Sequence, residues 1–157
     1  METRYLLLLP LQPVALGLYK SGTEHCTVMY WFTLGAVSVP ELLSGIRALS
    51  TEYLSSGITL EADKRADNFG PNGDISVQVL KKNPVLIQFH LAVKAFLDGF
   101  DCKHANVAWV GEGYRSHVTI VENPTFFPGT TREITQLAVL QGSTEGKYIV
   151  DVVELRK

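Results

Sequence analysis

The sequence predicts an α+β fold in which two lobes surround a shared core. Strand-like and helix-like segments follow the order strand, strand, helix, strand, strand, helix, strand and hairpin, which also fits a mixed α/β chain with its helices on one face. No low-complexity linker or charge run divides the 157 residues, a length typical of one domain. One strand with a His-x-Thr sequence occurs in each half. We therefore expect residues 1–157 to form a single domain of two lobes.

The chain opens with an apolar run, Tyr5 to Leu9, that predicts a strand buried on both faces. Arg4 precedes this run as in a signal peptide, but Pro10, Gln12 and Pro13 interrupt it. No small-residue cleavage site follows at a suitable distance. The run is also far shorter than the roughly 20 residues of a membrane span. We expect a cytoplasmic protein with no membrane association.

Two segments have the apolar spacing and the caps of helices. Ser38 and Glu41 have the spacing of a capping box, and Asn83 is placed to cap the second helix, which Gly99 ends. A proline stands in the first turn of each helix, where it is tolerated. The apolar stripes are Leu42, Ile46, Leu49 and Tyr53 in the first helix and Leu86, Phe89, Val93 and Phe96 in the second.

The remaining segments have strand patterns bounded by turn residues. The expected strands are His25 to about Leu34, two strands within 57–80 around the turn 70–74, a short strand at 106–110, a strand from His117 to Glu122, and a hairpin that pairs 132–142 with 147–157 across 143–146. The turn 70–74 consists entirely of turn-forming residues, with the sequence GPNGD.

Composition narrows the possible functions. The chain is 46% apolar and 19% charged, with a net charge of −2. A domain of this length buries roughly two thirds of its unfolded surface, so it needs no disulfide or metal for stability. Without a basic stripe it does not resemble a protein that coats duplex DNA, although it can bind a nucleotide or short oligonucleotide. Cys26 and Cys102 lack metal-finger spacing and are expected to be structural thiols. We expect a monomer without a cofactor.

The two His-x-Thr segments predict a catalytic pair. Side chains at i and i+2 of a strand share a face, so His25 lies beside Thr27, and His117 beside Thr119. If the two strands are neighbours, two imidazoles and two hydroxyls converge in one groove. Phosphodiester cleavage needs a base and an acid, and histidine can serve as either near neutral pH. The hydroxyls can donate to the non-bridging oxygens, and no metal is required.

Further substrate contacts are predicted near these motifs. Regular alternation places Met29 and Trp31 on the face of His25, where Trp31 either stacks on a base or belongs to the core. Tyr114 and Arg115 precede the second motif. Arg115 is a candidate phosphate contact, the alternative being an ordinary solvated arginine.

The motifs HCTV, at 25–28, and HVTI, at 117–120, resemble the signature of the 2H phosphoesterases. This family includes the bacterial 2′-5′ RNA ligase-like proteins and the cyclic phosphodiesterases. The resemblance extends to the opening strand at 3–11, the Phe-Gly turn and strand at 69–80, and the second helix. One departure is Ser116, where many members have proline before the second histidine.

The resemblance implies a bilobal fold, with two antiparallel sheets flanking a central groove and helices on the outside. It implies that His25 and His117 are the acid–base pair and that Thr27 and Thr119 bind the phosphate. Substrates in the family include 2′,3′-cyclic phosphates, 2′-5′ linkages and related nucleotide diesters. Some viral members degrade cyclic nucleotide signals of host immunity.

Two other functions remain open at the level of sequence. A module that binds RNA or a nucleotide without catalysis would use the same groove, and turnover distinguishes it from an enzyme. A metal site would need His25 and His117 with a carboxylate, but Glu24 and Glu122 fall on the opposite face. The other two histidines, His90 in the second helix and His104 in a loop, are expected to be structural or surface residues.

Overall fold

The computed structural model describes residues 2–155. In chain order the elements are β1 (Arg4–Pro10), β2 (Gly17–Leu18), β3 (His25–Thr33), α1 (Val39–Leu54), β4 (Ile58–Phe69), β5 (Ile75–Leu80), α2 (Pro84–Gly99), β6 (Lys103–His104), the 3₁₀ helices η1 (Val107–Trp109) and η2 (Gly111–Gly113), β7 (His117–Thr119), β8 (Thr131–Ile134), β9 (Gln136–Ser143) and β10 (Gly146–Glu154). The α+β prediction is confirmed.

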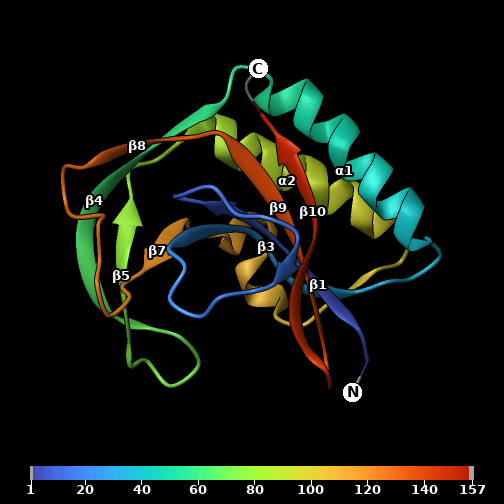
Figure 1. Cartoon of the computed structure of the whole chain (residues 1–157), viewed down its shortest axis with the longest axis horizontal. Helices are drawn as coiled ribbons and strands as arrows, with labels where there is room; N and C mark the ends of the chain where they lie inside the picture. Colours follow the sequence, from blue (N-terminus) through green and yellow to red (C-terminus); the bar gives the residue numbers. More distant parts are fainter. Residues whose placement is uncertain (1, 156–157) are drawn as a thin grey trace.

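The strands form one antiparallel sheet with the order β2-β10-β9-β1-β3-β7-β5-β4-β8, and β6 adds to β3. Two separate sheets were expected, but the pairing of Cys26 with Val118 joins the lobes through β3 and β7. Figure 1 shows β1, β3, β9 and β10 on the side of the helices, with β4, β5, β7 and β8 on the other side. We call these two groups of strands the two lobes. They are therefore joined at the two His-x-Thr strands, β3 and β7.

Both helices begin as their sequences predict. Ser38 and Glu41 form the complete capping box of α1, and the Asn83 side chain accepts a hydrogen bond from the Leu86 N–H at the start of α2. The helices pack on each other and on one face of the sheet (Figure 1). Within residues 2–155 the opposite face carries no α-helix, which leaves it available to a site.

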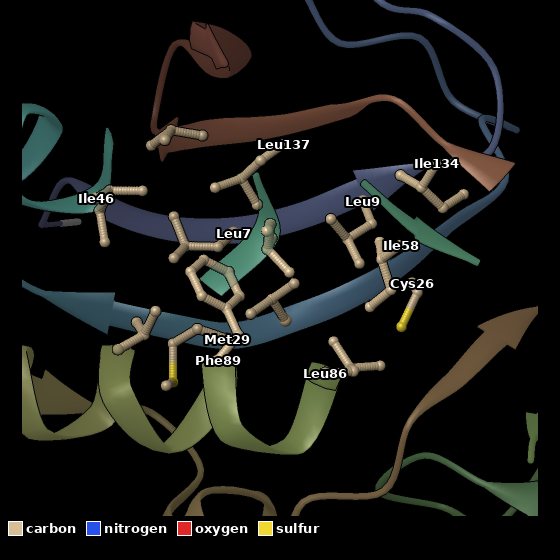
Figure 2. Packing of buried hydrophobic residues seen from close by; sticks show 14 of the residues in the cluster. Leu7, Leu9, Cys26, Met29, Ile46, Ile58, Leu86, Phe89, Ile134 and Leu137 are labelled. Atoms are coloured by element: carbon tan, nitrogen blue, oxygen red, sulfur yellow. The ribbon is translucent and has the colours of Figure 1, made fainter. Parts of the chain in front are cut away.

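The opening strand is buried on both faces, as predicted. Leu7 and Leu9 join the larger core cluster with Phe89 of α2 (Figure 2), and Leu6 and Leu8 join a smaller cluster on the helix-free face. This smaller cluster also contains Ala138, Leu140 and Ile149, with Val14, Tyr19, Trp31 and Val152 packed against it. Within residues 2–155 no helix has the length and apolarity needed to cross a membrane.

The turn between β4 and β5 is confirmed, and its glycines explain its position. Gly70 and Gly73 have φ values of 84° and 67°, a region that glycine enters without steric cost. The hairpin of β9 and β10 across 143–146 is also confirmed. Its second strand was expected to reach Lys157, but Arg156 and Lys157 lie outside the described residues.

Three predicted strands differ in the structure. Residues 107–109 form a 3₁₀ turn because the Asn106 side chain accepts from the Ala108 N–H and so favours a turn. The expected strand 132–142 is broken at Thr135, since β8 pairs with β4 in one lobe and β9 with β1 in the other. β7 ends at Thr119 and not at Glu122, although the Ile120 N–H still donates to the Ser76 carbonyl of β5.

Candidate active site

The two His-x-Thr strands are antiparallel neighbours, as predicted. Cys26 lies opposite Val118, so His25 is placed opposite Thr119, and Thr27 opposite His117. Cys26 and Val118 point into the core beneath the helices, and the four polar side chains therefore face the helix-free side. Diagonal neighbours in such a ladder lie about 7–8 Å apart, so the two imidazoles can flank one phosphate.

Both imidazoles are held in the same way. The Nδ1 atom of His25 lies 3.0 Å from the Thr23 carbonyl oxygen, and that of His117 lies 2.7 Å from the Arg115 carbonyl oxygen. A carbonyl only accepts hydrogen bonds, so Nδ1 carries the proton in each ring. The other nitrogen, Nε2, is then the one that can exchange a proton with a substrate.

A tyrosine hydroxyl also approaches each Nδ1 atom. Tyr19 Oη lies 3.2 Å from His25 Nδ1, and Tyr30 Oη lies 3.4 Å from His117 Nδ1. Burial raises the pKa of both phenols, so they stay protonated and neutral. Since each Nδ1 atom is a donor, both hydroxyl oxygens are placed to accept from it and to help fix the ring.

Burial lowers the pKa of both histidines. For His25, the Thr23 carbonyl opposes this shift and the positive charge of Lys147 adds to it. For His117, the Arg115 carbonyl opposes the shift, while the charges of His25 and of the Arg115 guanidinium lower the pKa further. The two imidazoles thus disfavour simultaneous protonation. This coupling separates the two protonation steps, so the two rings do not take up their protons together.

Aromatic rings surround His117. Its ring centroid lies 4.8 Å from that of Phe69, 6.2 Å from that of Trp109 and 6.3 Å from that of Tyr30. Phe69 is buried, and the Arg115 guanidinium lies over its ring at 4.2 Å. Tyr30 and Trp109 are half-buried, so they leave part of their surface to a ligand. The side of the site next to His117 is therefore aromatic and cationic.

A β-bulge in β3 places Tyr30 in this wall. Leu7 pairs with Met29 and Leu8 with Thr27, so Val28 is an extra residue in the ladder. Val28 and Met29 both point into the core, and the predicted position of Met29 on the face of His25 is wrong. The strict alternation of side chains, on which that prediction depended, does not continue through a bulge.

Trp31 contacts two cationic side chains and the smaller core cluster. Its ring contacts the Arg4 guanidinium at 4.2 Å and the Lys147 ammonium at 5.6 Å, and it packs against the smaller core cluster. Gly142 lies directly beneath it, where an added Cβ would come within 3.1 Å of the ring. Of the two roles considered for Trp31, its surroundings favour the core aromatic.

Tyr114 is turned towards the core. Its hydroxyl donates to the Thr27 carbonyl at 2.7 Å, and its ring stacks on His90 with centroids 4.0 Å apart. His90 is fully buried, with Nδ1 donating to the Val28 carbonyl and Nε2 accepting from the Gly111 N–H. Tyr114 and His90 therefore hold β3 at its bulge from the side opposite the groove.

Several other polar side chains have partners outside the histidine pair. His104 pairs with Asp98 at 3.0 Å, and Glu24 accepts hydrogen bonds from the Thr125 backbone and hydroxyl. Burial raises the pKa of Cys26 to about 12, which keeps this free thiol protonated, and Cys102 is also a free buried thiol. Within residues 2–155 no three His, Cys, Asp or Glu side chains are grouped as metal ligands.

Sequence reasoning missed four rings of the site: Tyr19, Tyr30, Phe69 and Trp109. Phe69 opens the Phe-Gly turn, so its position beside a glycine turn was a usable signal. Tyr30 depends on the bulge, and Trp109 on a 3₁₀ turn that resembles a strand in sequence. The regular two-residue alternation of a strand therefore predicts the position of neither ring.

No protein-family model matches the sequence, and a search of curated proteins found no relative. Solved structures do match. A phosphoesterase superposes with a TM-score of 0.59 and 16% identity over 99% of this chain and 100% of its own. E. coli LigT in complex with 3′-AMP gives 0.58 and 17% over 98% of both chains, and its NADP+ complex gives 0.57 and 15% over 99% and 98%. The chain thus has the fold of the LigT-like 2H phosphoesterases, which confirms the resemblance at the level of the fold.

Proposed function

We propose that the protein is a metal-independent phosphodiesterase that acts on a nucleotide or short oligonucleotide through two-histidine acid–base catalysis. The observation that carries this proposal is the pairing of Cys26 with Val118, which brings two imidazoles and two threonines to one face. The matching carbonyl contacts at both Nδ1 atoms support it, because they leave an equivalent nitrogen free on each ring.

In the proposed reaction, the neutral histidine removes a proton from the attacking water through Nε2. The water oxygen bonds to phosphorus, and the bond between phosphorus and the leaving oxygen breaks. The second histidine gives its Nε2 proton to that oxygen, so the pair ends with its protonation states exchanged. The hydroxyls of Thr27 and Thr119 donate to the non-bridging oxygens as negative charge develops there.

A nucleotide substrate fits the surroundings of His117. The half-buried rings of Tyr30 and Trp109 can stack on a base, and Arg115 can contact a phosphate or stack on the base itself. Nucleotides are also the ligands in structures of E. coli LigT, which were obtained with 3′-AMP, NADP+ and ATP. Tyr30 and Trp109 take the role that the sequence suggested for Trp31 and Tyr114.

The test is a hydrolysis assay in the presence of EDTA. The panel contains 2′,3′-cyclic nucleotides, 2′-5′ oligoadenylates and cyclic di- and trinucleotides. We expect turnover of at least one compound and a loss of about 10²- to 10⁴-fold in His25→Ala and in His117→Ala. His104→Ala is the matched control, because its ring pairs with Asp98 away from the groove.

Two results would contradict the proposal. Loss of activity on addition of EDTA would mean that a metal participates. Tight binding of a panel compound without turnover would indicate a binding module, the alternative that uses the same groove. Intact folding of each variant is checked by circular dichroism.

A further inference from the structure

A cavity of about 750 Å³ adjoins the groove at the start of β3. It is lined mainly by the loop 12–24, and by Asn123, Thr125 and Ile149. Thr23 and Glu24, which line it, directly precede His25. Tyr19 of the same loop contacts His25 Nδ1. The wall of this cavity is therefore continuous with one of the two histidines.

The cavity and the histidines lie on the same side of the sheet. Two of its lining residues, Val14 and Ile149, belong to the smaller core cluster on the helix-free face. His25 and Thr27 point to that face as well, because Cys26 and Val28 between and after them are in the core under the helices. A ligand in the cavity and a phosphate between the histidines can thus be parts of one molecule.

The cavity, the two histidines and the aromatic wall follow one another along strand β3. The cavity lies at Thr23, the two histidines lie near His25 and Thr27, and the aromatic wall begins at Tyr30. At about 3.3 Å per residue, this series extends over roughly 20 Å. The phosphate position is therefore central, with one binding region on each side.

The two regions differ in chemistry. The region next to His117 offers aromatic rings and a guanidinium group. The cavity has no aromatic ring among its lining residues, which all lie in the described part of the chain. It offers hydroxyl and amide groups, the exposed ammonium of Lys20 and an aliphatic wall, and its one carboxylate among the lining residues, that of Glu24, already accepts hydrogen bonds from Thr125. Its volume falls within the range of about 300–1,000 Å³ usual for small-molecule sites.

We infer that this cavity binds the second nucleotide unit of a substrate at least two nucleotides long. Its polar groups would contact the ribose, Lys20 would contact the next phosphate, and the base of the first unit would lie against Tyr30 and Trp109. Without an aromatic surface, the cavity would not hold the second base by stacking. This inference rests on the proposed function and specifies its substrate.

The experiment compares a 2′-5′-linked dinucleoside monophosphate with a mononucleoside 2′,3′-cyclic phosphate. Ala15→Trp fills the cavity from an exposed lining position, and Ala95→Trp places the same side chain on the exposed surface of α2 as a control. We expect Ala15→Trp to lower the ratio of kcat/KM values, dinucleotide over mononucleotide, by about tenfold or more. Ala95→Trp should leave this ratio unchanged.

A second variant tests whether the Lys20 ammonium contacts a substrate phosphate. Lys20→Gln should raise KM by about three- to tenfold for a dinucleotide with a terminal phosphate, and by less for one without it. An unchanged ratio in Ala15→Trp, with the dinucleotide turned over normally, overturns the cavity assignment and leaves the proposed function standing. If wild-type protein turns over neither compound nor any other member of the panel, the proposed function itself fails.

Discussion

Each groove histidine is bound at Nδ1 by the carbonyl of the residue two positions before it, Thr23 for His25 and Arg115 for His117. This contact is local, because it joins residues two positions apart. The same local geometry thus recurs in both lobes, although the lobes share little sequence. The β3–β7 pairing brings the two strands together, which the proposed mechanism requires.

The two threonines differ in exposure, which predicts unequal effects. Thr27 is 9% exposed, whereas Thr119 is exposed. Water can replace a lost hydroxyl at the exposed position, so we expect Thr119→Ala to reduce kcat by about tenfold and Thr27→Ala by about 100-fold. Single-turnover kinetics with saturating enzyme measure this difference. Equal losses would show that exposure does not govern the contribution of the hydroxyls.

A change at Tyr114 separates a structural role from substrate contact. Tyr114→Phe removes the hydrogen bond to the Thr27 carbonyl, so we expect the free energy of unfolding to fall by about 1 kcal/mol. KM should remain within about twofold of wild type because the ring faces the core. Urea denaturation and steady-state kinetics give the two values. A large rise in KM at unchanged stability would restore the role in substrate binding that the sequence suggested.

His90 is not a suitable control for the histidine variants, because its substitution would destabilise the fold. It is fully buried, and it joins the Val28 carbonyl to the Gly111 N–H. His90→Ala would leave both groups without a partner, which costs about 1–3 kcal/mol for each buried group. Controls for histidine variants should use His104, whose partner Asp98 is exposed.

Among the elements, β3 shapes the site because its bulge places the Tyr30 ring beside His117. We expect Tyr30→Leu to raise KM for nucleotides by about tenfold, since a stacked base contributes about 1–3 kcal/mol. Trp31→Leu should leave KM near wild type and lower the melting temperature, because Trp31 packs on the smaller core cluster. Nucleotide titration and thermal unfolding of the two variants provide the comparison. A raised KM in Trp31→Leu with an unchanged KM in Tyr30→Leu would contradict the proposal that Tyr30 stacks on the base.

The sequence predicts the elements whose signals are local. The capping box at Ser38, the cap at Asn83 and the glycine turn at 70–74 depend on neighbours within four residues, and all three are confirmed. The break at Thr135 was not predictable, because residues on both sides have strand patterns and only pairing with β4 or with β1 separates them. The bulge at Val28 likewise arises from the register with β1.

For the whole molecule, the groove depends on contacts that hold the lobes together at the start of β3. Glu24 accepts hydrogen bonds from Thr125, and Arg132 donates to the carbonyls of Leu11 and Thr125. These residues come from segments far apart in sequence. The pairing of the two motifs could be proposed from their shared alternation, but the contacts that secure it required the structure.

The same burial that shapes the site makes the stability of the molecule dependent on pH. Burial is the main cause that lowers the pKa of His25, His90 and His117 below the usual value of 6.5. Each folded-state pKa is lower than its unfolded value, so each group stabilises the fold above pH 6.5, and this contribution is lost as the pH falls below that value. Each such histidine changes the free energy of unfolding by at most about 1.4 kcal/mol per pH unit.

We therefore expect the melting temperature to fall as the pH decreases from about 7.5 to about 5, partly through these histidines. Carboxylates also titrate near the lower end of this pH range. The informative quantity is therefore the difference in melting temperature between wild type and variant at each pH. The double variant His25→Asn/His117→Asn, which lacks two of the three groups, should show a shallower decrease than wild type over that range. Parallel curves for wild type and the double variant would mean that the groove histidines are not desolvated in the folded protein.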